Sequence, residues 1–449
     1  MLKKLLAIKA GLSPNLSRIG ANLLWLFIDK FLQLGLSLTV GIWLARYLEP
    51  TLYGTYNYAL AFIAILMPIA SMGVSQITVR DLSKSVDEQK EILGTAFFLR
   101  VIGSIFCIAI INTLIQLGGW VDSQSKWLIL VMSLGLLFSP FEVINYWFQS
   151  QVKSKNVVIA KRLAYVCVAI SRVILILLKA PLIAFAGVYA LELLLGAVAL
   201  WCAYRIQGNN VTSWSVKPSK IYPMLKEGTP LIFAGLTVYI YSKIDQVMLG
   251  SLIVDQSQLA FYSISVRLSE TFDFLPSILA SSVLPRFTQL KAEGFSYTEK
   301  LQVYFDVMTL MWLAFALPVS LFSRPIIHIL YGDLYFPAVP MLQAYVWAQF
   351  GTCFGIARST FLTVERKLHY SFYISLLGAA VNILLNYILI PRYQAFGAIM
   401  ATLTTYFVVT VLLNVFVQDL RKIALNIVCS FNFFASIPRI KKVFVHDRN

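Results

Sequence analysis

Twelve long apolar stretches constrain the fold of this chain more than any other feature of its sequence. Each is about 20 residues long, the length that an α-helix needs to cross a hydrocarbon core of about 30 Å. Backbone in hydrocarbon finds no water, so such stretches must pair their own amide groups as helices. The sequence therefore predicts twelve transmembrane helices, at residues 20–44, 56–76, 93–116, 127–149, 157–178, 181–204, 229–252, 259–283, 302–323, 339–363, 370–390 and 395–417.

The composition favours lipid over water as the solvent of this chain. Hydrophobic residues make up 59% and charged residues 13%, against about 45–50% and about 25% in soluble domains. The net charge is +16, but Lys and Arg are dispersed among apolar runs and do not form the charge-rich face typical of nucleic-acid binders. These values exclude a soluble enzyme, a disordered chain and a disulfide-stapled secreted module, and we expect no nucleic-acid partner.

The longest internal connection, residues 205–223, separates two halves of six predicted helices each. Transporters are commonly built from two such repeats with the substrate site between them. We therefore expect an all-α polytopic membrane protein with two six-helix lobes, 1–204 and 224–418, around a central cavity. The connection is predicted to be cytoplasmic, and residues 419–449 form a basic cytoplasmic or interfacial tail.

The distribution of Lys and Arg predicts the orientation in the membrane. With a cytoplasmic N-terminus, 26 of the 37 basic residues fall on the cytoplasmic side and five outside, as the positive-inside rule requires. We expect a multi-pass protein of the plasma (inner) membrane with both termini cytoplasmic. Residues 423–437 are short for a span, and a crossing would carry Arg439 and Lys441 outside. An interfacial segment whose basic end contacts anionic lipid is therefore predicted.

The remaining six basic residues fall inside the predicted spans. Each costs about 2.5–3.5 kcal/mol at the centre of a helix in lipid, so an unpaired position facing lipid is disfavoured. Arg100 and Arg358 lie within about two turns of the cytoplasmic ends of their spans, where snorkelling is the alternative. The candidate substrate-binding residues, which would line a cavity for an anionic substrate, are Lys30, Arg100, Arg172, Lys243, Arg267 and Arg358.

Carboxylates in the same spans give a second set of candidates. Asp245, Glu270 and Asp273 either pair with cations on other helices or carry a proton or a sodium ion as a coupling site. Arg267 and Glu270 are three residues apart, a spacing that allows an ion pair along one helical face. The five cysteines show no metal-ligand spacing and are expected to be buried apolar side chains. No P-loop pattern occurs, so we expect no cofactor and no ATP site.

A series of landmarks along nearly the whole chain resembles one known family. Their order and spacing carry the resemblance, and Glu49 stands where the family often has glycine. The landmarks are Trp43 to Pro50 with Tyr53-Gly54, Lys243-Ile244-Asp245, Leu330-Tyr331-Gly332, Asn382 with Asn386-Tyr387, and Gly397-Ala398. The chain in these respects resembles the Wzx-type polysaccharide flippases of the multidrug/oligosaccharidyl-lipid/polysaccharide exporter superfamily.

The resemblance implies a transporter for surface polysaccharide biosynthesis. It would flip polyprenyl-pyrophosphate-linked oligosaccharide units from the cytoplasmic to the outer leaflet by alternating access, beside a polysaccharide polymerase machinery. Two alternatives stay open. A multidrug exporter of the same superfamily would carry organic cations, which six intramembrane cations disfavour. A membrane-embedded polymerase or glycosyltransferase would be an enzyme, and it would need larger outer loops than the short ones predicted here.

Overall fold

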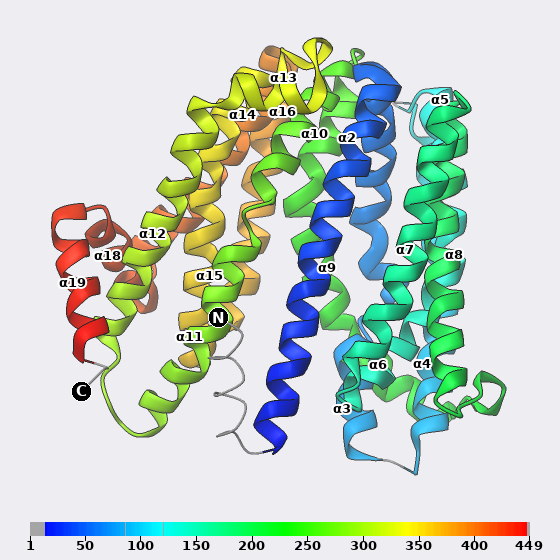
Figure 1. The fold of residues 1–449 in the computed structure, drawn as a ribbon, viewed down its shortest axis with the longest axis horizontal. Helices are drawn as coiled ribbons and strands as arrows, with labels where there is room; N and C mark the ends of the chain where they lie inside the picture. The colour runs from blue at the N-terminus through cyan, green and yellow to red at the C-terminus, as the bar shows by residue number, and fades with distance from the viewer. Residues whose placement is uncertain (1–13, 86, 120, 447–449) are drawn as a thin grey trace, which may run out of the picture. The chain divides into compact units, whose positions relative to one another are not determined.

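The structure, a computed structural model, is helical throughout the residues that it describes. It describes residues 14–85, 87–119 and 121–446, with the side chains of 14–34, 36, 154 and 442–446 left aside. No strand occurs in these ranges. The chain forms two compact units, the first containing residues up to Tyr47 together with Phe62–Leu236, and the second containing Leu48–Ala61 together with Thr237 onward. Figure 1 traces the helices in chain order.

Two helices contribute residues to both units, α2 (Pro14–Ser71) and α9 (Pro218–Leu252). The first unit contains a run of helices between them, together with two 3₁₀ segments at Gly135–Glu142 and Val211–Ser213. These helices are α3 (Ser75–Lys84), α4 (Gln89–Leu117), α5 (Ser123–Leu134), α6 (Val143–Ser150), α7 (Ser154–Leu177) and α8 (Leu182–Ile206).

The second unit continues from α9 and contains both long and short helices. Its helices are α10 (Ser257–Glu270), α11 (Phe274–Ala292), α12 (Thr298–Leu321), α13 (Ser323–Tyr331), α14 (Ala338–Tyr345), α15 (Gln349–Val364), α16 (His369–Phe407), α17 (Leu413–Phe416), α18 (Arg421–Ser430) and α19 (Phe433–His446). A π-helical segment, Val408–Leu412, joins α16 to α17.

Each of the twelve predicted spans coincides with helical structure, and two long helices hold two spans each. The chain in α2 bends at Glu49 (φ 56°, ψ 171°) and that in α16 bends at Gln394 (φ 52°). Pro50 accounts for the first bend, because proline disfavours helical geometry in the residue before it. By length and composition, six helical segments among the described residues qualify as membrane spans, or seven if α18 and α19 count as one.

Each unit has its own apolar core. The core of the first unit includes Val74, Leu93, Ile144, Trp147 and Phe148. The core of the second unit is built on α12 and α15 and includes Phe305, Met308, Phe354, Leu362 and Ile427.

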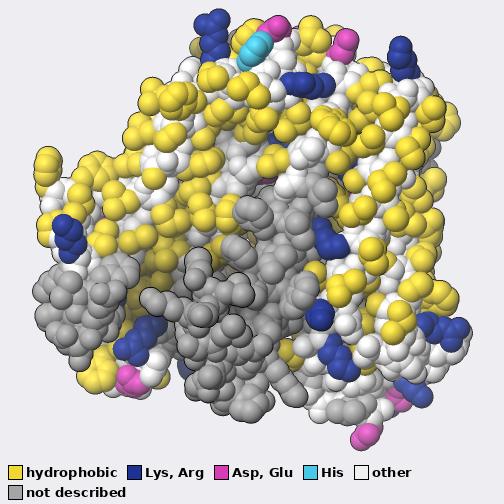
Figure 2. Space-filling view, viewed as in Figure 1, with side chains coloured by type: hydrophobic (Ala, Val, Ile, Leu, Met, Phe, Trp, Pro, Cys, Tyr) yellow, Lys and Arg dark blue, Asp and Glu magenta, His cyan; other side chains and the backbone are white. Residues whose placement is uncertain are grey.

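Apolar side chains cover much of the outer surface, as expected of helices that lie in lipid. Leu117, Leu177 and Phe434 are among the exposed large hydrophobic residues. Figure 2 shows hydrophobic side chains, in yellow, over much of the described surface, with most Lys and Arg near the top and bottom of the view. The cysteines correct one expectation: all five are free, and only Cys107 and Cys353 are buried. The other three, Cys167, Cys202 and Cys429, are exposed.

The connection after α8 packs onto α4 within the first unit. The Ser215 amide donates to the Lys90 carbonyl (3.3 Å), and the Lys217 amide donates to Thr95 Oγ1 (3.1 Å). Trp214 packs against the ring of Phe97 with centroids 5.6 Å apart. This connection, predicted as a cytoplasmic linker, is therefore a structured part of the unit that it follows.

Candidate functional site

A cavity of about 290 Å³ with several charged lining residues lies in the first unit, between α2, α4, α7, α8 and the 3₁₀ segment Gly135–Glu142. Its apolar lining includes Met67, Phe138 and Leu193. Its charged lining comes from five side chains, which are Arg100, Glu142, Lys161, Arg162 and Glu192. Charged groups between membrane-spanning helices mark a functional site by default.

Arg100 is the most deeply buried charge of this cavity. Its side chain is 5% exposed, and its Nη1 donates to the hydroxyl of Tyr146. Its Nε has no hydrogen-bond partner among the described residues. A guanidinium keeps its charge in proteins, and an unsatisfied buried donor is costly. Snorkelling would place the guanidinium at an exposed position, whereas the Arg100 side chain is buried.

Both carboxylates of the cavity are already paired with cations. Lys161 Nζ donates to Glu142 Oε1 (2.7 Å) and Oε2 (2.9 Å). Arg172 Nη2 lies 2.6 Å from Glu192 Oε2. The lining carries three cations against two carboxylates, and Arg172 neutralises one of these. The cavity therefore has a net positive charge.

A second polar cluster surrounds Asp245 in the second unit. Its side chain is buried and accepts hydrogen bonds from Tyr262 (2.7 Å), Thr402 (2.6 Å) and Asn386 (2.5 Å). Asn386 also donates to Asn382 Oδ1, and its own Oδ1 has no partner among the described residues. No Lys or Arg of the described part of the chain lies within ion-pair distance of Asp245. The cluster is a carboxylate held by neutral donors and surrounded by oxygen atoms.

The other predicted site residues of the second unit lie on α9, α10, α15 and the turn before α11. Lys243 Nζ lies 3.6 Å from Glu270 Oε1. Asp273 has a buried Oδ1 without a hydrogen-bond partner in the described structure. Arg358 Nη1 donates to the carbonyl of Val409 (2.5 Å), inside the π-helical segment, whose wide turn frees carbonyl groups.

The structure thus gathers most of the predicted residues into two groups. Arg100 lines the cavity of the first unit and Arg172 pairs with Glu192 of that lining, whereas Lys243, Asp245 and Glu270 belong to the second unit. The other four predicted residues are Lys30, Arg267, Asp273 and Arg358, of which Asp273 and Arg358 are described above. Arg267 is a half-buried residue of α10, and Lys30 lies on α2 with its side chain outside the described residues.

Several residues of these groups were missed by reasoning from the sequence. Lys161 and Arg162 were counted among the orienting cations, but α7 begins at Ser154 and carries both to the cavity. Asn382 and Asn386 were noted as landmarks without a role. Their i, i+4 spacing on an apolar helix was a usable signal, because it places two amides on one face.

Comparison with known proteins places the chain in a family. The sequence model described as polysaccharide biosynthesis protein matches residues 19–291, more than half of the chain. The chain belongs to the polysaccharide biosynthesis protein family. A model named MatE matches residues 230–388 of this family member. No curated protein sequence matches at a significant level.

Solved structures similar to this family member share its fold. They include lipid II flippase MurJ in an inward closed conformation (TM-score 0.72, 14% identity, 94% of this chain and 97% of that one). An inward-facing multidrug resistance MATE family transporter of the MOP superfamily gives a TM-score of 0.68 at 14% identity, over 89% and 99% of the two chains. An outward-facing structure of such a transporter gives 0.56 at 14%, over 95% and 96%.

These matches confirm the predicted fold class of an all-α, multi-pass membrane protein like the twelve-helix MurJ and MATE transporters. The matched family model is described as polysaccharide biosynthesis protein, and the solved structures that share the fold are titled as a flippase and as transporters. Among the described residues, no group of three or more His, Cys, Asp or Glu side chains could hold a metal ion.

Proposed function

We propose that this transporter flips polyprenyl-pyrophosphate-linked oligosaccharide units from the cytoplasmic to the outer leaflet for surface polysaccharide biosynthesis. The family description and the likeness to a structure titled lipid II flippase support a lipid-linked saccharide as the cargo. The observation that carries the proposal is the net positive cavity of the first unit, in which the buried Arg100 keeps an unsatisfied Nε.

A pyrophosphate suits the chemistry of this cavity. Arginine presents a planar fork of donors that matches phosphate oxygens, and Lys161 adds a compact point charge. Hydrogen bonds between charged partners are roughly twice as strong as neutral ones. An anionic headgroup would accept a hydrogen bond from Arg100 Nε and would also offset the excess positive charge of the cavity.

Alternating access is the transport mode that we propose. Solved structures of the same fold are titled inward-facing and outward-facing, which supports two conformations for this fold. With a negative cytoplasm, each negative charge that moves outward gains about 2.3 kcal/mol per 100 mV. The membrane potential then contributes to export of the pyrophosphate without ATP.

Asp245 is the coupling residue that we propose for a proton or a sodium ion. It is a buried carboxylate without an ion-pair partner in the described structure, and three neutral donors hold it in place. Loading one cation onto such a group changes its charge, and this change can favour one of two conformations. Glu270 and Asp273 lie on the same unit as secondary candidates, and Glu270 is already close to Lys243.

The alternative of a multidrug exporter is less well supported by the charges. An organic cation would meet three cations in the cavity lining, where both carboxylates are already paired. The proposal also includes a place in the inner membrane with both termini in the cytoplasm. There the protein would contact anionic lipid and lie near a polysaccharide polymerase machinery.

A complementation experiment tests the function in cells. A strain that lacks the protein should accumulate lipid-linked units on the cytoplasmic leaflet and lose surface polysaccharide. The wild type and a control, Arg392→Gln at an exposed position of the second unit, should restore export, whereas Arg100→Gln in the cavity of the first unit should restore little of it. Full export by Arg100→Gln at equal protein level would overturn the role of this cavity. Export of single units by the deletion strain would indicate a polymerase.

A further inference from the structure

The last two helices form a hairpin that packs beside α12 in the second unit. α18 and α19 are bent by 102° across Phe431 and Asn432. Length and composition allow two topologies for this pair, one broken span or a re-entrant loop. The contacts along α12 distinguish the two, because they give the depth of each part of the hairpin.

α18 runs along α12 from the beginning of that helix toward its middle. Gln302, one turn into α12, donates to the Asn426 carbonyl (3.0 Å). Thr309 donates to Ser430 Oγ (2.7 Å), seven residues or about 10 Å further along at 1.5 Å per residue. The ring of Trp312 lies 6.2 Å from that of Phe431. The turn of the hairpin is therefore near the middle of the predicted span 302–323.

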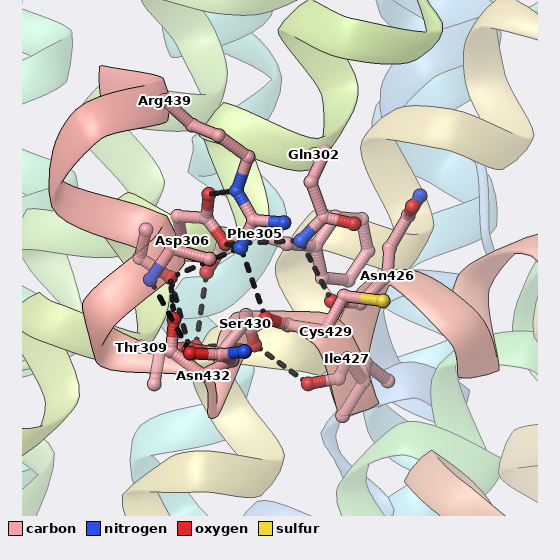
Figure 3. A network of polar contacts seen from close by, with 12 residues as sticks. Gln302, Phe305, Asp306, Thr309, Asn426, Ile427, Cys429, Ser430, Asn432 and Arg439 are labelled. Atoms are coloured by element: carbon pink, nitrogen blue, oxygen red, sulfur yellow. Dashed lines mark hydrogen bonds and ion pairs between the residues drawn. The ribbon is translucent and has the colours of Figure 1, made fainter. Parts of the chain in front are cut away.

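α19 then brings the chain back toward the beginning of α12. Arg439 Nε lies 2.9 Å from Asp306 Oδ2, and its Nη2 donates to Oδ1 (3.0 Å). Asp306 lies between Gln302 and Thr309, so at Arg439 the chain is again closer to the beginning of α12 than the turn of the hairpin is. Figure 1 shows α19 running toward the end at which α12 begins, and Figure 3 shows Arg439 reaching Asp306.

The ion pair explains why the hairpin stays in place. The Asp306 side chain is 0% exposed, and Gln302 also donates to its Oδ1 (2.9 Å). A buried carboxylate without its cation is strongly disfavoured, whereas a paired and hydrogen-bonded one is tolerated. Arg439 Nη2 donates as well to the Cys429 carbonyl (3.0 Å). One side chain thus ties α12, α18 and α19 together.

The outer side of the hairpin is apolar, and its base is basic. Leu425, Val428 and Phe434 are exposed, Phe434 at 94%. Arg421 and Lys422 begin the hairpin, and Lys441 lies near its end, all three exposed. No Asp or Glu occurs between Leu420 and His446. An apolar face with cations at one end complements the acyl chains and the headgroup of an anionic phospholipid.

We propose that α18–α19 is a re-entrant hairpin that dips into the bilayer from the side on which α12 begins and binds anionic phospholipid at its base. That side is cytoplasmic in the predicted orientation. The acyl chains pack on Leu425, Val428 and Phe434, and the headgroup contacts Arg421, Lys422 and Lys441. The Asp306–Arg439 pair positions the hairpin and takes no part in binding the lipid. The sequence predicts that Arg439 contacts lipid, but in the structure its side chain forms an ion pair with Asp306.

Cysteine labelling tests the re-entrant path. In full-length protein without its native cysteines, single cysteines replace Lys422 and His446, one at each end of the hairpin. A membrane-impermeant maleimide is applied to intact cells and to inside-out vesicles. We expect both positions to react in the same preparation, the inside-out vesicles. Reaction of the two positions from opposite faces would show a span and overturn the proposal.

Lipid-dependent melting tests the anionic ligand. Full-length protein is melted in nanodiscs of phosphatidylglycerol and of phosphatidylcholine. We expect a higher Tm in phosphatidylglycerol, and the variant Arg421→Gln/Lys422→Gln/Lys441→Gln should lose most of this difference. The matched control Lys126→Gln/Arg324→Gln/Arg392→Gln removes three cations elsewhere and should keep it. No difference for the wild type, or an equal loss in both variants, would contradict the lipid site.

Hydrogen exchange tests the positioning role of the ion pair. Asp306→Asn leaves Arg439 without its charge partner, and we expect exchange of the α18–α19 amides to rise at least tenfold. The double variant Asp306→Asn/Arg439→Gln removes the unpaired charge and should recover part of the protection. Unchanged exchange in the single variant would overturn the positioning role.

Discussion

Lys243 and Glu270 come from consecutive helices, α9 and α10, and bring Nζ and Oε1 to 3.6 Å. Variants of this pair distinguish two roles of Lys243, which either binds the substrate or only balances the charge of Glu270. Lys243→Met should lower export at least about tenfold, since tenfold corresponds to about 1.4 kcal/mol of lost interaction. Lys243→Arg keeps the charge and should keep most of the export. Surface polysaccharide and protein level are measured together.

The double variant Lys243→Met/Glu270→Gln provides the control for this pair. It removes both charges, so protein level and Tm should return toward those of the wild type while export stays low. Export restored to the wild-type level would mean that Lys243 serves only to balance Glu270.

Asp245→Asn should uncouple transport from the ion gradient. The substitution keeps the size of the side chain and its contacts with Tyr262 and Thr402 but removes the negative charge that a proton or sodium ion would neutralise. In proteoliposomes, an imposed gradient of the coupling ion should stimulate the wild type and leave the variant unchanged. A wild type that ignores both gradients would end the coupling hypothesis.

Gly94→Ala should destabilise the first unit. A Cβ at Gly94 would lie 2.4 Å from the Ser215 carbonyl oxygen and within 3 Å of two further backbone atoms of Ser215, so the connection after α8 would have to move. Overpacking of this kind costs about 1–3 kcal/mol, visible as a lower Tm in detergent. Gly187→Ala is the matched control, with open space around its Cβ, and should leave Tm unchanged or higher. Equal melting of both variants would refute the contact.

Glu49→Gly should stabilise the bend in α2. Glu49 has φ 56° and ψ 171°, a region that is open essentially to glycine and costs other residues about 1–3 kcal/mol. Glycine removes this strain but gains entropy in the unfolded chain, so a net gain of about 1 kcal/mol is expected from thermal melting. Glu49→Ala removes the carboxylate and keeps the strain. A rise in Tm with alanine as large as with glycine would show that charge, and not backbone strain, is the cause.

Acid should weaken the first unit through two carboxylates outside the spans. Hydrogen bonds from Lys220 and from Arg80 lower the pKa of Glu88 and of Glu227, respectively. A lowered folded-state pKa gives stability that is present above the unfolded value of about 4.3 and is lost as pH falls through the folded value. The Tm of the wild type should therefore drop more steeply below about pH 4.5 than that of Glu88→Gln/Glu227→Gln. Parallel curves would contradict this linkage.

The spans and the breaks between them could be predicted from the sequence because both depend on local chemistry. Apolar length predicts a helix in lipid, and Pro50 predicts the bend at Glu49. The break between the last two spans was expected as a loop, but the structure shows only a bend at Gln394 within one long helix, α16. Residues such as proline predict where a helix is interrupted, whereas the angle of the bend depends on tertiary packing.

The partners of the site residues could not be predicted, because they depend on which helix faces meet. Asp245 lies 17 residues from Tyr262 and 157 from Thr402, and apolar periodicity does not specify such contacts. The spacing of Arg267 and Glu270 allows an ion pair along one helix, but it does not specify that Glu270 also lies 3.6 Å from Lys243 of the preceding helix. The tail was expected to meet lipid with Arg439, whereas the burial of Asp306 directs that side chain inward.

Translocation by the purified protein tests the central claim most directly. Proteoliposomes containing a polyprenyl-pyrophosphate oligosaccharide are assayed for the headgroup that becomes accessible to an external glycosidase, under an imposed membrane potential. We predict that the wild type flips the lipid and that Arg100→Gln flips it at least about tenfold more slowly, because a charged contact with the pyrophosphate is lost. A wild-type rate no higher than that of protein-free liposomes, or equal rates for the two proteins, would contradict the account.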